Sequence, residues 1–342
     1  MSAEDIPAEY FRLRDGDGPP ETDAVEERGK PSLNFVQDSW RRLRKNRAAA
    51  AASVVLAFII AAASLAPLLA PVPPNEQHIP YANLPPRLPG CTLRGLNGEL
   101  QFRGQWVNRY EQAGVPAEVN FIFGTDEFGR DLFSRCLYGT RISLIIAFIA
   151  AIMDLSIGVA YGMTSAMGGG RTDTLMQRLL EILAGVPSLI LVVLMLLIFR
   201  PGILSIIFAL VISSWIPMAR LVRAQTLRIR GLEYVLAARA LGSSVPRIAF
   251  FHVLPNIAGT IIVRTMFSIP QAIFFETFLS FIGVGMKIPN ASLGTLLGGG
   301  YKMFRIYPYQ MWFPAAILCL VMLAFNLLAD GLRDAFDPKM KD

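Results

Sequence analysis

The chain of 342 residues is too apolar for a soluble protein, since 53% of its residues are hydrophobic and only 17% are charged. Soluble domains carry about a quarter of charged residues, so a water-soluble globular protein is excluded. The net charge of +6 is uneven: residues 1–32 hold nine acidic and four basic side chains, which leaves +11 for the remainder. That excess indicates loops that face the cytoplasm and anionic lipid. No basic stripe lies on a soluble domain, which argues against nucleic acid as a partner.

Six apolar runs predict an all-α integral membrane protein with six transmembrane helices. The first run, 48–70, has 23 residues without a charge, enough to cross a hydrocarbon core of ~30 Å. Because 47 residues precede it, we interpret it as an uncleaved anchor and not as a signal peptide. Arg200, Pro201 and Gly202 predict a turn between two antiparallel helices. The other runs are 142–167, 179–199, 202–219, 257–285 and 312–329.

Basic residues predict the orientation of these helices. With the N-terminus inside, the inner segments beyond the acidic tail 1–32 carry sixteen Lys and Arg residues and the short outer loops carry four, as the positive-inside rule requires. Both termini are therefore predicted to be cytoplasmic. The predicted parts are a cytoplasmic tail with a basic amphipathic end (1–47), the first transmembrane helix (48–70), an extracytoplasmic segment (71–141), a five-helix core (142–329) with a cytoplasmic loop (220–256), and a cytoplasmic C-terminal tail (330–342).

The loop 220–256 carries the most specific pattern. Apolar residues at helical spacing predict a short amphipathic helix from Glu233, capped by Gly242. Ser243 or Ser244 and Pro246 then predict the start of a second helix, which we expect to stop near Leu254 and Pro255. Small residues at the join would let another protein approach this knob closely. Taken alone, the composition is equally typical of an ordinary basic loop.

The order of Glu233, Ala237-Ala238, Gly242 and Leu254-Pro255 resembles the E-A-A…G…L-P signature of ABC importer permeases. Three further strings resemble dipeptide and oligopeptide permeases, and among these the C-type subunit of the permease pair. They are Phe123-Gly124-Thr125-Asp126-Glu127-Phe128-Gly129-Arg130-Asp131, Glu276-Thr277-Phe278-Leu279-Ser280-Phe281-Ile282-Gly283-Val284-Gly285, and Asp330-Gly331-Leu332-Arg333-Asp334-Ala335-Phe336-Asp337-Pro338.

The resemblance implies a type I ABC importer permease of the inner membrane that translocates peptides. Its implied partners are a homologous second permease, two cytoplasmic ATP-binding subunits and an extracytoplasmic peptide-binding protein. Alternatives are a permease for nickel or another small solute, or a proton-coupled secondary transporter. By the resemblance, the residues that contact the ATPase are Glu233, Ala237, Ala238, Arg239, Gly242, Leu254 and Pro255.

No enzymatic activity and no bound cofactor are expected of this chain. It has no Walker A pattern, and Gly29-Lys30 is its one Gly-Lys pair, so ATP and magnesium are expected to bind to the partner subunits. A nucleophile elbow is also missing. Three cysteines and two histidines make no metal cluster by spacing. A disulfide between Cys91 and Cys136 is one alternative, since both are predicted on the oxidising side.

Two acidic residues lie deep inside the apolar runs, whereas Glu181 is only two residues into the third run and can stay hydrated. Asp154 is at the middle of the second run, and Glu276 lies in the fifth. A carboxylate at the bilayer centre costs ~2.5–3.5 kcal/mol on insertion scales, so each is a candidate for lining a translocation path. The alternative is a buried structural pair. For the 124–131 string we favour a structural turn over a binding role, because Gly124 and Gly129 permit positive φ.

Overall fold

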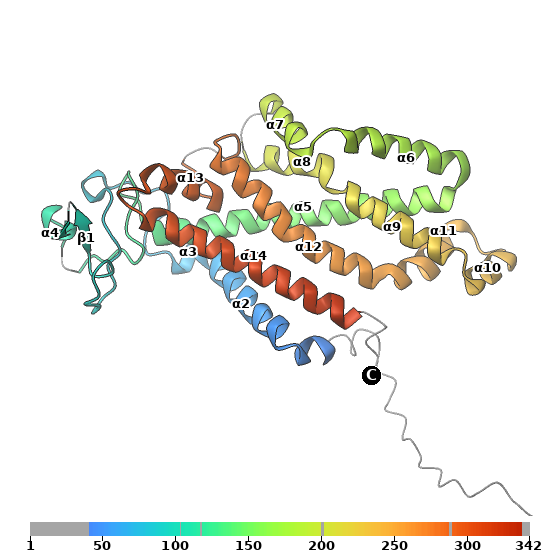
Figure 1. Cartoon of the computed structure of the whole chain (residues 1–342), viewed down its shortest axis with the longest axis horizontal. Helices are drawn as coiled ribbons and strands as arrows, with labels where there is room; N and C mark the ends of the chain where they lie inside the picture. The colour runs from blue at the N-terminus through green and yellow to red at the C-terminus, as the bar shows by residue number, and fades with distance from the viewer. Residues whose placement is uncertain (1–40, 103, 117, 200–201, 287–288, 337–342) are drawn as a thin grey trace, which may run out of the picture.

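The computed structural model describes residues 41–102, 104–116, 118–199, 202–286 and 289–336. Its long helices form a bundle along the long axis, with the strands at one end, the hairpin end, and α10 and α11 at the other, the knob end (Figure 1). The bundle helices are α2 (Arg47–Ser64), α5 (Leu132–Gly168), α6 (Gly170–Gly185), α7 (Ser188–Ile198), α8 (Ile203–Ser214), α9 (Ile216–Ile229), α12 (Leu254–Phe281) and α14 (Tyr309–Phe336). Shorter elements are α3 (Ala66–Leu69), β1 (Glu99–Phe102), β2 (Gln105–Asn108), α4 (Arg109–Gln112), α10 (Glu233–Ala240), α11 (Val245–Ile248) and α13 (Leu293–Met303).

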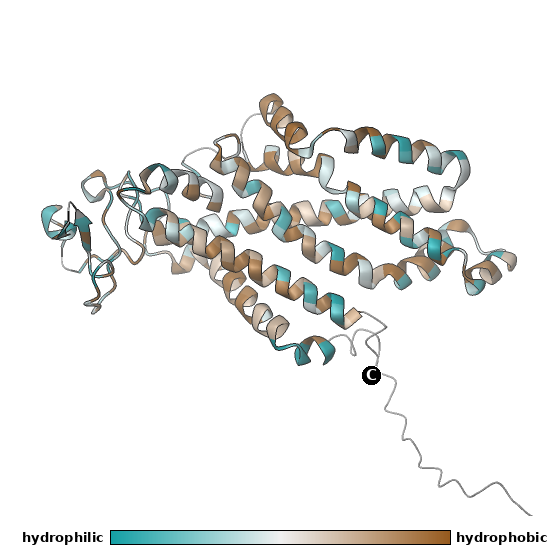
Figure 2. Ribbon diagram, viewed as in Figure 1, coloured by the Kyte–Doolittle hydropathy of each residue, from teal (hydrophilic) through white to brown (hydrophobic). Residues whose placement is uncertain are grey.

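The described helices include five that are long and apolar enough to cross a membrane. The pair α6 and α7 makes a sixth if it counts as one span, although the two are bent by 80° at their junction. Figure 2 shows apolar residues along the bundle helices and hydrophilic residues around β1 and α4. Every predicted apolar run therefore falls on a helix or on two consecutive helices. The predicted turn at Arg200 and Pro201 lies outside the described residues.

Several helices extend beyond the predicted runs, because hydropathy marks only the apolar part of a helix. α5 begins at Leu132, ahead of the run 142–167, since the Asp131 carboxylate accepts a hydrogen bond from Ser134 N at 2.8 Å and caps the first turn. α14 likewise continues to Phe336, past residue 329. α13, between α12 and α14, was not predicted. It begins with a capping box of Ser292 and Thr295.

The second helix of the knob does not stop near Leu254 and Pro255, so that prediction is wrong. α11 passes through a π-helical turn, Ala249–Val253, directly into α12. Leu254 N donates to Ala249 O, five residues back. A proline in an α-helix lacks a donor and crowds the carbonyl four residues earlier, and the wider turn relieves this conflict. The result is one helical segment, Val245–Phe281, of 37 residues.

The string 124–131 is the anchor of the hairpin end, as the structural interpretation predicted. Thr125 is fully buried, and its hydroxyl accepts from Leu84 N at 2.8 Å and donates to Tyr81 O at 2.5 Å. The Arg130 guanidinium bonds Asp126 at 2.7 Å. Gly129 has φ +70°, and a Cβ there would lie 1.8 Å from His78 O. A tight turn therefore fixes segment 78–84 against the start of α5.

Close packing of α5 on α9 holds the middle of the bundle together. Gly158 and Gly162, one turn apart on α5, face Met218 and Ala219 of α9. A Cβ on Gly162 would lie 2.4 Å from Ala219 O, and one on Gly158 would lie 2.6 Å from Met218 Cβ. Small residues are what permits such an approach between membrane helices.

We expect Gly162→Ala to lower the free energy of unfolding by about 1–3 kcal/mol, because it overpacks this contact. The matched control is Gly185→Ala at the end of α6, where a Cβ meets nothing within 4 Å. Thermal unfolding in detergent, followed by helical circular dichroism, measures both. Equal melting temperatures for the two variants would contradict the close contact of α5 with α9.

Candidate functional site

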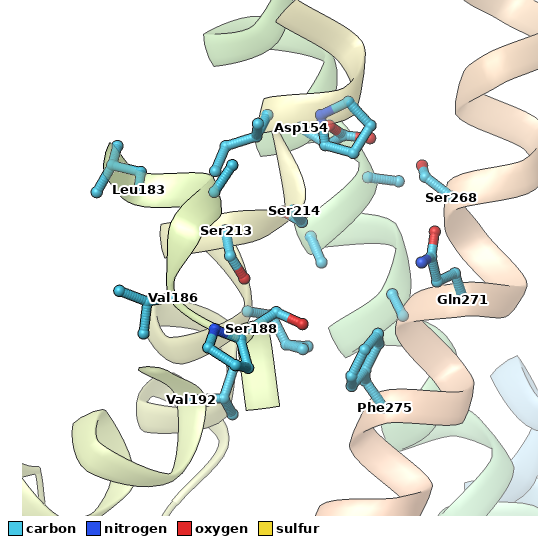
Figure 3. A pocket seen from close by; sticks show the side chains of 18 of the residues that line it. Asp154, Leu183, Val186, Ser188, Val192, Ser213, Ser214, Ser268, Gln271 and Phe275 are labelled. Carbon is cyan, nitrogen blue, oxygen red and sulfur yellow. The ribbon is translucent and has the colours of Figure 1, made fainter. Parts of the chain in front are cut away.

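A cavity of about 300 Å³ lies in the middle of the bundle. Helices α5, α8, α9 and α12 and the α6–α7 junction form its walls. In Figure 3 the side chains of Gln271 and Phe275 project from α12 toward those of Ser188 and Ser213 on the other side. The cavity thus joins four parts of the chain that are far apart in sequence.

Helical periodicity explains why these residues meet. Residues three and four apart share one face of a helix. α12 presents Ser268, Gln271, Ala272 and Phe275 at this spacing, and α5 presents Ala150 and Asp154. The bend between α6 and α7, where Pro187 precedes the first turn of α7, brings Ser188 to the same space. An aligned face of each helix therefore lines the cavity.

Asp154 is the one acidic residue among the described residues that line the cavity. It is 1% exposed, and neither of its carboxylate oxygens has a hydrogen-bond partner within the described ranges. The nearby Ser268 hydroxyl donates to Thr265 O at 2.9 Å instead. The buried Ser214 Oγ, on another wall, likewise has no partner in the described part of the chain. Two polar groups therefore face the cavity with unused hydrogen-bonding capacity.

Sequence reasoning identified Asp154 but missed the neutral polar lining. A single serine hardly lowers the hydropathy of an apolar run, so by itself it does not predict a functional site. The spacing of Ser268 and Gln271 on an otherwise apolar helix is the signal that was available. The uncharged polar residues of the lining are Ser188, Ser213, Ser214, Ser268 and Gln271.

Glu276, the second acidic candidate, lies at a different place and makes hydrogen bonds. It is fully buried and is not among the residues that line the cavity. Ser143 Oγ of α5 donates to Glu276 Oε2 at 2.7 Å, and Ser280 Oγ donates to Oε1 at 2.9 Å. Ser143 Oγ also accepts from Leu293 N at 3.3 Å. The Glu276 cluster, Glu276 with Ser143 and Ser280, therefore ties together α5, α12 and the start of α13.

The knob consists of α10 and α11, joined at Gly242. Glu233 begins α10 as predicted, and Gly242 follows its end with φ +81°. Glu233, Ala237, Arg239 and Gly242 are exposed, and Ala238 is half-buried. Leu254 is half-buried and Pro255 exposed at the start of α12. The seven predicted residues thus divide between the knob and the base of α12.

The knob surface is apolar as well as basic. Large hydrophobic side chains are exposed on it, and Leu241 at the join is 88% exposed. Beneath them Val235 is buried, in one cluster with Ile248 and Val253 and with Met218 of α9. Exposed apolar patches of this kind mark interaction sites. The other exposed hydrophobic residues of the knob and its base are Leu232, Tyr234, Leu236, Val245, Phe250 and Phe251.

Cys91 and Cys136 are free thiols in the structure, so the disulfide alternative is not realised. Cys136 is buried in α5 beside Leu132, Leu296 and Tyr309, whereas Cys91 lies in the segment before β1. Packing of Cys136 among apolar neighbours accounts for its burial, since a free cysteine behaves as a small hydrophobic residue.

A bundle of apolar helices encloses a cavity with a few polar side chains and carries an exposed knob. These features define a membrane transport protein with several spans. The chain belongs to the family described as binding-protein-dependent transport system inner membrane component, whose model matches residues 155–342. Residues 34–86 match the model described as the N-terminal TM domain of oligopeptide transport permease C. The resemblance to ABC importer permeases is confirmed.

Similar proteins extend along nearly the whole chain. The dipeptide transport system permease protein DppC of Lactococcus lactis is 41% identical and covers 94% of this chain and 95% of its own. The oligopeptide transport system permease protein OppC of Bacillus subtilis is 38% identical and covers 93% of this chain and 94% of its own. An inward-facing structure of the MetNI methionine ABC transporter has a TM-score of 0.51 at 18% identity, covering 60% of this chain and 97% of that one. The predicted helical importer-permease fold is confirmed.

We expect Glu276→Leu to lower the free energy of unfolding by about 3–5 kcal/mol, because it removes two hydrogen bonds to a carboxylate and leaves two buried hydroxyls without an acceptor. Glu276→Gln keeps the shape and one acceptor oxygen, and its amide NH2 group can donate to the other serine hydroxyl, so it should cost far less. Thermal unfolding in detergent separates the two variants. A Leu variant as stable as the Gln variant would mean that the Glu276 cluster does not hold α5 to α12.

Proposed function

We propose that this chain is a membrane-spanning permease subunit of an ATP-driven ABC importer that translocates peptides delivered by an extracytoplasmic binding protein. The observation that carries the proposal is the similarity to proteins named dipeptide and oligopeptide permeases over more than nine-tenths of the chain. A homologous second permease and two ATP-binding subunits complete the assembly. ATP hydrolysis belongs to those subunits, and the chain has no enzymatic activity of its own.

The proposed docking site for an ATP-binding subunit is the knob. Its exposed leucine and phenylalanine side chains supply apolar contact area, while Arg239 and Arg247 supply positive charge for acidic partners. Ala237, Ala238 and Gly242 at the join allow close approach of another backbone. These features support the coupling role of the residues from Glu233 to Pro255.

Force on the knob has a direct route into the bundle. α11 and α12 form one helical segment, so displacement of the knob tilts the wall of the cavity that Ser268 and Gln271 belong to. Val235 adds a second connection, because it packs against residues of α9 and α12. Movement of the ATP-binding subunits would thereby open or close the cavity, with Asp154 on the translocation path.

Two alternatives receive less support. None of the described residues that line the cavity is His, whose imidazole is the side-chain ligand that suits nickel. A proton-coupled transporter would use Asp154 and Glu276 together, but Glu276 lies outside the cavity lining and accepts two short hydrogen bonds. Uptake of labelled peptide into proteoliposomes that contain the complete assembly, with ATP or with a proton gradient alone, distinguishes these functions.

We expect Gly242→Asp to leave the permease in the membrane but to abolish ATPase binding and peptide uptake. Gly242 is exposed, and a Cβ there meets nothing within 4 Å, so the change causes no clash within the described residues. Its φ of +81° adds local backbone strain of ~1–2 kcal/mol. An uncompensated charge buried where the knob contacts an ATP-binding subunit costs ~3 kcal/mol or more. This corresponds to about 100-fold weaker binding of that subunit. Co-purification of the ATP-binding subunits and vesicle uptake are the measurements.

The control is Gly90→Asp at the hairpin end, which has φ +75° and the same open surroundings. It imposes the same backbone strain without touching the knob and should assemble and transport normally. A Gly242→Asp complex that assembles and transports at the rate of the Gly90→Asp complex would refute the docking role of the knob.

The proposed orientation places the knob end in the cytoplasm. Leu93 at the hairpin end is 65% exposed and Leu241 of the knob is 88% exposed, so a cysteine at either position is accessible. In a background with the three native cysteines replaced, a membrane-impermeant maleimide should label Leu93→Cys in intact cells and Leu241→Cys only after lysis. The opposite pattern would invert the topology.

A further inference from the structure

We propose that the cavity is a binding site for the α-ammonium group of a peptide, with the Asp154 carboxylate as its counter-ion. The inference rests on the peptide import proposed above and assigns the chemical group that the permease itself recognises. Asp154 is the natural partner because it is almost fully buried, yet both its oxygens lack a hydrogen bond within the described ranges.

A buried carboxylate without donors is an unusual state, since buried charges are normally paired. Glu276 shows the usual state in the same bundle: hydroxyl groups donate to both of its oxygens. The nearby Ser268 hydroxyl does not donate to Asp154 in the same way, because it donates to Thr265 O. Within the described residues the Asp154 carboxylate thus accepts no hydrogen bond, and a ligand in the cavity can supply one.

Two arginines lie in the same region, and neither neutralises Asp154 by contact. Arg264 of α12 acts on Asp154 through space, and Arg220 of α9 is an exposed residue of the cavity lining. No ion pair within 4.0 Å joins either of them to Asp154 in the described part of the chain. Arg220 also gives the cavity a positive group, suited to a carboxylate or carbonyl of the same peptide.

An ammonium group matches the remaining features of the cavity. It has three donors, and the two Asp154 oxygens and the unpartnered Ser214 Oγ offer three acceptors. α6 ends at Gly185 beside the cavity, with Leu183 and Ala184 in the lining, and the carboxyl end of a helix carries partial negative charge that favours a cation. The charge and the acceptors thus point to the same ligand group.

The size of the cavity limits what it can hold. About 300 Å³ is at the lower end of the range for ligand pockets, which suits one or two residues and not a whole oligopeptide. Recognition of the amino end alone would leave the remaining peptide free in length and side chains. The permease would then select for a free amino terminus and not for sequence.

Chemical coupling tests the contact without transport. The complete assembly, without binding protein, is incubated with a carbodiimide and alanylalaninamide or its N-acetyl derivative, and Asp154 is analysed by mass spectrometry. The activated carboxyl forms an amide with a neighbouring amine. We expect the dipeptide amide on Asp154 and none from the acetylated compound. Reagent adducts of equal yield with both peptides, or an unmodified Asp154 with both, would overturn the proposal.

Uptake of a labelled dipeptide by the complete transporter with its binding protein tests the role of the charge. We expect Asp154→Asn to reduce uptake at limiting peptide by ~10- to 100-fold, as for loss of one charge-assisted hydrogen bond, and Asp154→Glu to recover part of it. The control is Glu276→Gln, which neutralises a buried carboxyl outside the cavity. Uptake by the Asp154→Asn complex equal to that of the unmutated complex would refute the ammonium site.

The two failures remain distinguishable. If the unmutated assembly imports no peptide in the presence of ATP, peptide import is wrong, whereas the coupling reaction still reports whether Asp154 binds an amine. If it imports peptide and Asp154→Asn imports equally well, peptide import stands and the assigned contact is wrong.

Discussion

The helical segment from Val245 to Phe281 is the constraint on which the rest of the structure depends. Its first turns belong to the knob, its middle presents Ser268 and Gln271 to the cavity, and its far end carries Glu276. The helix continues through Pro270, so these three places lie on one element and a displacement at one of them is passed to the others. The π-helical turn before Pro255 preserves this continuity, because an ordinary proline in that position would end or kink the helix.

The two membrane acids show how environment decides what a carboxylate does. Glu276 has donors on both oxygens and fastens α12 to α5, so it stabilises one arrangement. Asp154 has no donor in the described part of the chain and belongs to the lining of the cavity. A fully satisfied polar network rigidifies a core, whereas a buried polar group without partners is costly until it gains one. The Glu276 cluster therefore fixes the contact of α12 with α5, whereas the cavity lining at Asp154 is open to a ligand.

The sequence was most informative where one residue type has one physical consequence. Apolar runs located the spans, Gly242 marked the end of α10, and the cost of a membrane carboxylate identified Asp154 and Glu276. It could not separate the roles of these two acids, because the hydroxyls that bond Glu276 come partly from Ser143, far away in sequence. The continuation of α11 into α12 was missed for a related reason: Pro255 is a strong breaking signal, and only the backbone pairing five residues back overrides it.

The break at Pro187 has a consequence for biogenesis. α7 has 11 residues, or about 16 Å of helix, which is half of a bilayer core of ~30 Å. It packs through Val192 and Leu196 against Ile206 and Leu210 of α8. Since α7 is too short to cross alone, it gains a stable place in lipid only together with α8. α7 and α8 are therefore expected to enter the bilayer together, as one pair of packed helices.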